Sequence, residues 1–268
     1  MATIVATLNA RTQKSREGFS AAKLEKALES GYMLMSRESQ HRQKKSFAPS
    51  SIGYQHGTCP RYWHIAFGGA HFEEKAAAWN VSVMGSGTAA HERIQNAFNA
   101  AGVLESKELE LKNEDPPIFG YIDVILDIDG DRVVGEIKTT GADAFRYRAH
   151  TGRPAPAHLY QILTYMKVLG MDQGFLLYED RDSLQVAIID VSMDEVHQSM
   201  IDDAFAWMQS VYDNWKSGGE IPKAPWTRRN KSCRGCPVFD TCWDSGLPEG
   251  STAIGAMDVV KPWETDQG

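Results

Sequence analysis

The sequence has 268 residues, enough for one substantial domain with appendages, and its 42% hydrophobic and 24% charged residues are ordinary for a soluble globular protein. No apolar run is long enough to span a bilayer, so we expect no membrane segment. A net charge of −7 argues against a surface that is basic throughout, which leaves any nucleic-acid binding to local basic stretches.

The N-terminal part of the chain is expected to be helical. Residues Met1–Arg16 contain no acids, and we interpret them as a flexible or docking arm. A helix is predicted around Ser20–Leu34, and the stretch Ser50–Phe67 is expected to be helical and to carry Cys59. A further helix is expected to have His91 in its first turn, where a single histidine is more often a surface or packing residue than a ligand.

Three strands are predicted next, over residues 105–112, 118–128 and 132–139, and the turn Asp129-Gly130 joins the last two. Asp-Gly between alternating apolar runs is a strong hairpin signal. With these two residues as the loop, Asp123 lies opposite Glu136, and opposed side chains have Cβ atoms roughly 4.5–5.5 Å apart. A three-residue loop would send Glu136 to the other face. The core side of the first hairpin strand is expected to carry Ile122, Val124, Leu126 and Ile128.

Two carboxylates held this close repel each other unless a proton or a cation lies between them. Lys138 follows Glu136 by two residues and therefore shares its face of the strand. An oxygen-rich site of this kind selects a hard divalent ion such as Mg²⁺ or Mn²⁺. The alternative is a surface cluster in which Lys138 simply neutralises Asp123 and Glu136.

A helix is predicted over Ala157–Leu169, with Gly170 as its stop. Gln161 and Tyr165 are four residues apart and are therefore neighbours on one helix face. Taken alone, this pair is typical of an ordinary boundary between core and surface.

Basic residues precede this helix in what we expect to be a loop. Arg146, Arg148 and Arg153 lie where such a loop can overhang the acidic hairpin and contact DNA, although a solvated loop face is the alternative.

The remaining elements are two strands, a long helix and a tail. Strands are predicted over residues 175–179 and 184–190, and Ser192-x-x-Glu195 resembles a capping box for a helix that ends near Gly218. The tail from Ser245 is rich in small residues and is expected to be loosely held. This order of elements predicts an α/β fold in which a mixed central β-sheet is flanked by helices.

The four cysteines form another signal. Three are clustered as Cys233-x2-Cys236-x5-Cys242, and the fourth, Cys59, lies far upstream. Compact spacing of this kind favours a metal site over disulfides. Four thiolates complete either a tetrahedral zinc site or an iron–sulfur cluster, and the spacing does not choose between them.

Together these motifs resemble the iron–sulfur branch of the PD-(D/E)xK nucleases, the RecB-like exonucleases that include the CRISPR-adaptation nucleases and the AddB nuclease module. The family pattern is a Gly-x-x-x-His helix, a strand Asp, a Glu-x-Lys strand and a Gln-x-x-x-Tyr helix, with one cysteine before and three after. The matching residues, in order, are Cys59, Gly87, His91, Asp123, Glu136, Lys138, Gln161, Tyr165, Cys233, Cys236 and Cys242. One departure is the absence of the founding motif's proline, since Ile122 precedes Asp123.

The resemblance implies a restriction-endonuclease-like core over residues 48–243, between an arm and helix at 1–47 and a tail at 244–268. It implies that Mg²⁺ or Mn²⁺ is bound by His91, Asp123, Glu136 and the carbonyl of Ile137. Lys138 would then orient the attacking water, and Gln161 and Tyr165 would contact the DNA strand. The resemblance also favours a four-iron, four-sulfur cluster over zinc in a module formed by Cys59 and residues 230–243.

The predicted function is therefore a DNA exonuclease that acts on single-stranded DNA or DNA ends in recombination, repair or replication. We expect it in the cytoplasm of a prokaryotic cell or a phage-infected host. No Gly-x4-Gly-Lys-Ser/Thr motif is present, so unwinding would come from a helicase partner. The alternatives are a DNA-binding subunit of a recombination or CRISPR-adaptation-like complex with a partner-dependent nuclease site, and a zinc-stabilised interaction protein with an incidental acidic hairpin.

Overall fold

The computed structural model describes residues 20–36, 43–72 and 78–265 and divides the chain into two units. The smaller unit comprises Met1–Gln40 with Ala76–Met84, and the larger comprises His41–Lys75 with Gly85–Gly268. The basic arm predicted over Met1–Arg16 lies outside the described residues.

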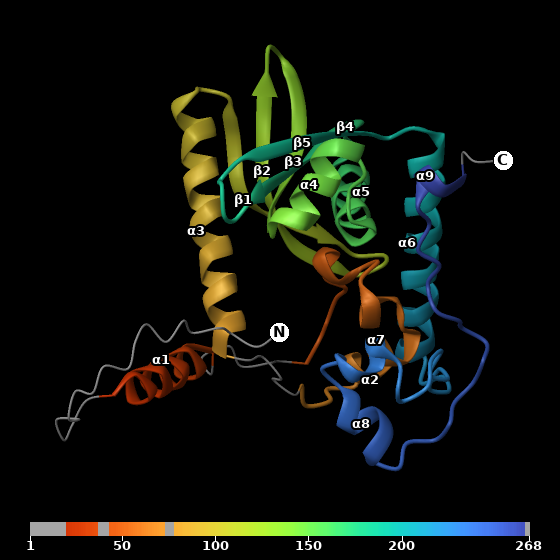
Figure 1. Cartoon of the computed structure of the whole chain (residues 1–268). Helices are drawn as coiled ribbons and strands as arrows, with labels where there is room; N and C mark the ends of the chain where they lie inside the picture. Colours follow the sequence, from red (N-terminus) through yellow and green to blue (C-terminus); the bar gives the residue numbers. More distant parts are fainter. Residues whose placement is uncertain (1–19, 37–42, 73–77, 266–268) are drawn as a thin grey trace. The chain divides into compact units, whose positions relative to one another are not determined.

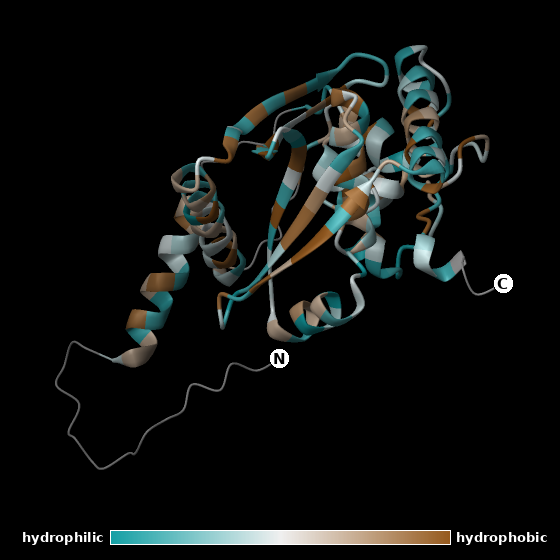
Figure 2. Ribbon diagram, turned by 90° about the horizontal axis from the view of Figure 1, so that it is seen from above, coloured by the Kyte–Doolittle hydropathy of each residue, from teal (hydrophilic) through white to brown (hydrophobic). Residues whose placement is uncertain are grey.

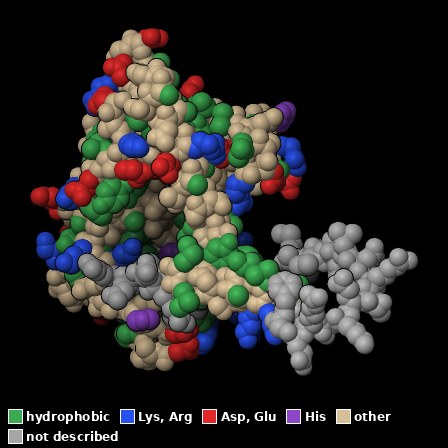
Figure 3. Space-filling model, turned by 90° about the vertical axis from the view of Figure 1, so that its left-hand side faces the viewer, with side chains coloured by type: hydrophobic (Ala, Val, Ile, Leu, Met, Phe, Trp, Pro, Cys, Tyr) green, Lys and Arg blue, Asp and Glu red, His purple; other side chains and the backbone are tan. Residues whose placement is uncertain are grey.

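In the smaller unit, the predicted first helix is present as α1 (Ala21–Ser36). The unit also contains the start of α3 (Ala78–Ala100), and the rings of Tyr32 and Trp79 lie 5.7 Å apart between their centroids. Figure 3 shows hydrophobic side chains gathered over these helices. The exposed large apolar side chains of this unit include Leu24, Leu28, Leu34, Met35, Trp79 and Val83.

The larger unit is built on a five-stranded sheet in the order β1-β2-β3-β4-β5 (Figure 1). The strands are β1 (Leu104–Asn113), β2 (Ile118–Ile128), β3 (Asp131–Thr140), β4 (Gln173–Asp180) and β5 (Val186–Ser192). Only β3 and β4 pair in parallel, and the other neighbours are antiparallel. The predicted mixed α/β sheet is therefore confirmed.

The hairpin between β2 and β3 has the predicted two-residue loop. Ile128 pairs with Asp131, and the last paired residues are Val124 and Gly135. Asp129 and Gly130 both have positive φ angles, 56° and 95°, as a type I′ turn requires. The prediction that Ile128 faces the core is wrong, because the hairpin tip extends beyond the packed region and leaves this residue 40% exposed.

Apolar side chains pack on both faces of the sheet in two clusters. Figure 2 shows hydrophobic and hydrophilic residues alternating along the strands. One cluster joins Ile125 and Leu176 to α5 (Pro156–Leu169), which presents the predicted stripe of Leu159, Ile162, Leu163 and Met166. On the other face, Val124 and Leu177 pack with Ile94 of α3. The polar site described below lies between these two clusters.

The segment expected to be one helix over Ser50–Phe67 is broken into three pieces. Two short 3-10 turns, η1 (Pro49–Ser51) and η2 (Gln55–Thr58), precede α2 (Pro60–Phe67). Gly53 between the two turns has φ +76°, which interrupts the helix, and Pro60 can stand only in the first helical turn. Cys59 consequently occupies the N-cap of α2.

Helix α3 is longer than predicted, so His91 lies in its interior and not in its first turn. The helix was expected to open at Gly87, and a glycine costs about 1 kcal/mol in a helix interior. The helix continues through this residue nevertheless.

The loop expected between β3 and α5 is instead a helix, α4 (Ala142–Thr151). It begins after Gly141 and ends at Gly152, whose φ of 65° is the left-handed conformation common after helices. Only Phe145 of this helix is buried, which explains why its sequence carries no clear apolar stripe.

After β5 the chain forms α6 (Glu195–Lys216), whose N-cap is Asp194 and not the predicted Ser192. Asp194 Oδ1 accepts a hydrogen bond of 2.8 Å from the His197 backbone N–H. The short helices α7 (Lys231–Arg234), α8 (Phe239–Asp244) and α9 (Pro262–Thr265) follow.

The C-terminal segment, expected to be loosely held, makes specific contacts. Met257 is buried, and its N–H donates to the Thr58 carbonyl at 2.9 Å. Trp207 Nε1 donates to the carbonyl of Gly255 at 2.9 Å. None of the described helices is both long and apolar enough to cross a membrane.

Candidate active site

The centre of the site is the point where β2 and β3 separate. Asp123 and Glu136 lie one step beyond the last paired residues of the hairpin, so the carboxylate of Asp123 can enter the space between the strands. Its Oδ2 accepts a hydrogen bond of 2.7 Å from the backbone N–H of Ile137. Both acids are buried, with 7% of Asp123 and 2% of Glu136 exposed.

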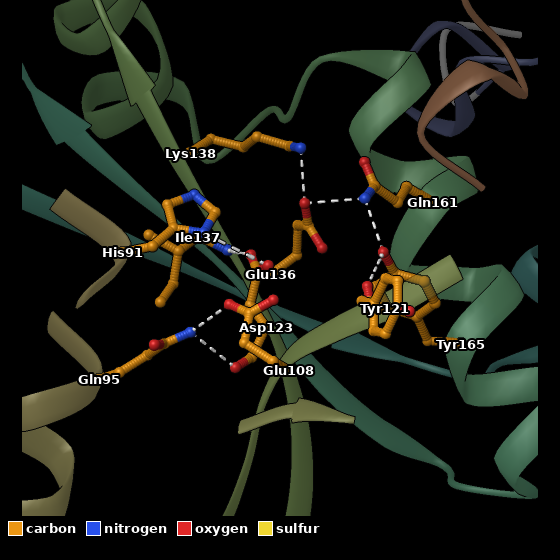
Figure 4. Close-up of polar contacts among 10 residues, drawn as sticks. All are labelled: His91, Gln95, Glu108, Tyr121, Asp123, Glu136, Ile137, Lys138, Gln161 and Tyr165. Atoms are coloured by element: carbon orange, nitrogen blue, oxygen red, sulfur yellow. Dashed lines mark hydrogen bonds and ion pairs between the residues drawn. The ribbon is translucent and has the colours of Figure 1, made fainter. Parts of the chain in front are cut away.

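Glu136 is held through one oxygen only. Its Oε1 lies 2.5 Å from Lys138 Nζ and accepts a hydrogen bond of 2.8 Å from Gln161 Nε2 (Figure 4). Its Oε2 is buried and has no partner among the described residues. Burial, with a further contribution from the Asp123 charge, raises the pKa of Glu136 to about 7.

His91 approaches the same carboxylates from α3. Its Nδ1 lies 3.4 Å from Asp123 Oδ1. The hydrogen bond with Asp123 raises the pKa of His91, and burial opposes this effect. The structure therefore brings His91, Asp123, Glu136 and Lys138 together; the hairpin pattern grouped the last three, and His91 was added by the family resemblance.

Glu108 is a candidate ligand that the sequence reasoning missed. One ligand atom each of His91, Glu108 and Asp123 lie within 4.8 Å of one another. Gln95 Nε2 connects the group, because it donates to Glu108 Oε1 at 2.8 Å and to the Asp123 carbonyl at 3.0 Å.

The position of Glu108 follows from the pairing of β1 with β2. Lys107 pairs with Val124 and Leu109 pairs with Ile122, which places Glu108 opposite Asp123. Glu108 has φ +49°, a conformation that is uncommon outside glycine and often marks functional sites.

Gln161 and Tyr165 lie behind Glu136, on the side of α5. Gln161 Nε2 donates to Tyr165 Oη at 2.7 Å, and Tyr165 Oη donates to the Tyr121 carbonyl at 2.9 Å. Both side chains are buried. Their contacts hold Glu136 in place, while the DNA contact suggested by resemblance stays a prediction.

The three arginines near the site differ in their surroundings. Arg146 is exposed and pairs with Asp143 on its own helix. The guanidinium carbon of Arg148 lies 4.8 Å from the ring centroid of Tyr178, which is next to Lys138 in the sheet. Arg153 lies in the short connection between α4 and α5.

All four cysteines line one small cavity, although Cys59 is distant in the sequence from the other three. The cavity has a volume of about 20 Å³ and is also lined by apolar and aromatic side chains such as Tyr62 and Val238. None of the four cysteines forms a disulfide. Burial raises the pKa of Cys59 to about 12, so this sulfur needs a cation nearby to be a thiolate.

A buried guanidinium stands beside this cavity. Arg61 is 4% exposed, and its Nε donates to Cys242 Sγ at 3.2 Å. Its Nη1 donates to the carbonyls of Pro222 and Glu249, each at 3.1 Å. Arg61 pairs with no carboxylate among the described residues, and a buried cation of this kind favours negative charge on the sulfurs.

The match to known proteins agrees with this geometry. A family model, "PD-(D/E)XK nuclease superfamily", matches residues 88–243, and the chain belongs to this superfamily. It is therefore a nuclease, of a class that uses divalent metal ions. No curated protein matches its sequence.

Several solved structures have a similar fold. The crystal structure of SSO0001 has a TM-score of 0.47 and 18% identity, over 84% of this chain and 98% of that chain. An alkaline exonuclease, LHK-Exo from Laribacter hongkongensis, has a TM-score of 0.43 and 15% identity, over 64% of this chain and 90% of that chain. The structure of LHK-Exo in complex with dAMP has a TM-score of 0.42 and 15% identity, over 65% of this chain and 89% of that chain.

Proposed function

We propose that the chain is a divalent-metal-dependent DNA exonuclease acting on single-stranded DNA or DNA ends. The observation that carries this proposal is Glu136, a buried carboxylate beside Asp123 whose Oε2 has no partner in the described part of the chain. When a buried acid has an oxygen without a partner and lies next to a second acid, either a proton or a cation is needed to offset the negative charge. In a nuclease of this superfamily, a cation is the functional choice.

We assign His91, Asp123, Glu136 and the carbonyl of Ile137 as the ligands of Mg²⁺ or Mn²⁺. Glu108 is added because its carboxylate lies within 4.8 Å of the His91 and Asp123 ligand atoms. Carboxylate and carbonyl oxygens are the donors that these ions prefer. When bound, the ion would polarise the scissile phosphate and make the attacking water more acidic.

Lys138 has two tasks in this proposal. Its ammonium, 2.5 Å from Glu136 Oε1, would donate to the attacking water and to the phosphate oxygens on which negative charge grows. The water oxygen would form a new bond to phosphorus as the bond from phosphorus to the leaving sugar oxygen breaks. The water would lose one proton to solvent and the leaving oxygen would take one up from solvent, so the step balances. Gln161 and Tyr165 keep Glu136 in position during this step.

The exonuclease and DNA assignments are supported by the order and spacing of the sequence motifs, which resemble those of the RecB-like branch. Of the predicted DNA-binding arginines Arg146, Arg148 and Arg153, Arg148 lies over Tyr178, the strand neighbour of Lys138, and supplies positive charge there in a chain of net charge −7. Backbone phosphates are the ligands that such residues bind. Recombination, repair or replication of DNA is the proposed context.

We also propose that Cys59, Cys233, Cys236 and Cys242 hold a structural metal centre that joins α2 to the C-terminal module. Their position around one cavity and the neighbouring Arg61 guanidinium support this assignment. A volume of about 20 Å³ suits a single zinc ion, because it holds about one water-sized group. The resemblance favours a four-iron, four-sulfur cluster, for which the sulfurs would lie further apart.

The proposed function is tested by comparing linear with circular single-stranded DNA as substrate in the presence of Mn²⁺. An exonuclease degrades only the linear form, and Lys138→Met is expected to lose this activity. Lys112→Met is the matched control, because Lys112 is an exposed strand lysine paired with Glu110. Equal activity of Lys138→Met and wild type would overturn the assignment.

A further inference from the structure

A second group of donors lies beside Lys138, on the side of the site away from His91. Tyr178 of β4 is the strand neighbour of Lys138, and it is fully buried. His158 of α5 and Arg148 of α4 both contact this tyrosine. Because Lys138 pairs with Tyr178 across β3 and β4, the group adjoins the proposed catalytic centre.

Hydrogen bonds connect Tyr178 to its neighbours. The hydroxyl accepts from the Ala155 N–H at 3.2 Å, and its oxygen lies 2.9 Å from His158 Nδ1. Burial and the charges of Lys138 and Arg148 lower the pKa of His158 to about 3, so the ring is neutral at pH 7. When the Tyr178 hydroxyl donates to Nδ1, the ring hydrogen is on Nε2, which is then a donor.

Arg148 has no acid to neutralise it in the described part of the chain. Its Nη1 donates to the Ala144 carbonyl of its own helix at 2.7 Å, and its buried Nε has no acceptor. The neighbouring arginines differ, since Arg146 pairs with Asp143 and Arg93 pairs with Glu179. Arg148 and the neutral His158 ring thus both contact Tyr178, beside Lys138, whose own ammonium pairs with Glu136.

We propose that Arg148 and His158 bind the DNA backbone phosphate next to the scissile one. This inference rests on the proposed function, because it places the substrate across the Glu136 site. A phosphate offers acceptor oxygens and a negative charge, and arginine binds such oxygens with two parallel hydrogen bonds. The bound phosphate positions the strand and makes no contact with a base, so the subsite accepts any sequence.

The test measures the affinity for a set of single-stranded oligonucleotides, each with one neutral methylphosphonate at a different position. Ca²⁺ replaces Mg²⁺, and gels verify that the DNA stays intact. Binding by the wild type is expected to weaken about tenfold for methylphosphonate at one position adjacent to the cleavage site. Arg148→Met is expected to weaken binding of unmodified DNA by a similar factor and to abolish the effect of that one methylphosphonate.

Two further variants test whether the methylphosphonate effect comes from this subsite or from positive charge in general. Arg132→Met removes an exposed arginine paired with Glu105 and is expected to keep the full methylphosphonate effect. His158→Gln retains a side-chain donor and is expected to keep part of the methylphosphonate effect. The position of the sensitive phosphate is measured with the wild type alone, so a folding defect in Arg148→Met does not affect that result.

The outcomes distinguish this inference from the proposed function. If the wild type never cleaves DNA with Mg²⁺ or Mn²⁺ but shows the Arg148-dependent methylphosphonate effect, the subsite stands and the nuclease assignment fails. If the wild type cleaves DNA but no single methylphosphonate position weakens its binding, the subsite is overturned. It is also overturned if the methylphosphonate effect survives in Arg148→Met. Absence of any DNA binding by the wild type overturns it as well.

Discussion

The stability of the metal-free protein should depend on the proton that Glu136 holds. Burial and the charge of Asp123 raise the pKa of Glu136 from its usual value near 4.5 to about 7. Below pH 4.5 the Glu136 side chain is protonated in both the folded and the unfolded state. Between pH 4.5 and 7 this side chain ionises in the unfolded chain but keeps its proton in the folded one, so the folded state is progressively destabilised as the pH rises. Above pH 7 the full loss of about 3 kcal/mol is reached.

His91 acts in the same direction. Its pKa is raised chiefly by the hydrogen bond with Asp123, so its contribution to stability is complete below the unfolded pKa of 6.5. This contribution is lost as the pH rises through the folded pKa. The two groups therefore reinforce each other near neutral pH, and a divalent cation that binds the ionised site should restore the lost stability.

The variant Glu136→Gln removes this titration while keeping the shape of the side chain. We expect the variant and the wild type to have similar free energies of unfolding at pH 5, measured by urea denaturation without added divalent cation. At pH 8 the variant should be more stable by up to about 3 kcal/mol. Added Mg²⁺ at pH 8 should stabilise the wild type and not the variant.

Glu110→Gln is the control for this comparison, because Glu110 is exposed and pairs with Lys112. It should follow the wild type at every pH. A difference between wild type and Glu136→Gln that is the same at pH 5 and pH 8 would refute the reasoning. So would equal stabilisation of both proteins by Mg²⁺.

Three further predictions concern the supporting residues. Tyr165→Phe removes a buried hydroxyl that bonds to Gln161 and to the Tyr121 carbonyl. The free energy of unfolding should therefore fall by about 1–3 kcal/mol and cleavage should slow. An unchanged midpoint of urea denaturation would contradict this. Cys233→Ser should lose the bound iron or zinc by elemental analysis and lower the Tm, whereas full metal content would exclude Cys233 as a ligand. Glu108→Gln should raise the Mn²⁺ concentration needed for half-maximal cleavage about tenfold, and an unchanged metal dependence would exclude Glu108.

The hairpin that carries the site could be predicted from the sequence because its turn is local. Asp129-Gly130 suits a type I′ turn, and a two-residue loop fixes the register that brings Asp123 toward Glu136. The helical face shared by Gln161 and Tyr165 also follows from a local period. These parts of the site depend on neighbouring residues alone.

Other features depend on contacts between distant segments and could not be predicted this way. Glu108 reaches His91 through the pairing of β1 with β2 and a positive φ angle, neither of which the sequence displays. Helix α4 has one buried side chain, Phe145, and therefore no apolar period. The approach of Cys59 to the later cysteines came from resemblance to a family, since spacing cannot show it.

The central claim is that Glu136 and its neighbours form a metal-dependent nuclease site. The most direct measurement follows the loss of 5′- and 3′-end-labelled DNA, single- and double-stranded, after Mn²⁺ or Mg²⁺ is added to chelator-treated wild type and Glu136→Gln. We expect metal-dependent release of nucleotides by the wild type and none by Glu136→Gln, with Glu110→Gln fully active. Degradation of DNA by Glu136→Gln at the wild-type rate, or degradation by the wild type in excess chelator, would show that this site is not a metal-dependent nuclease.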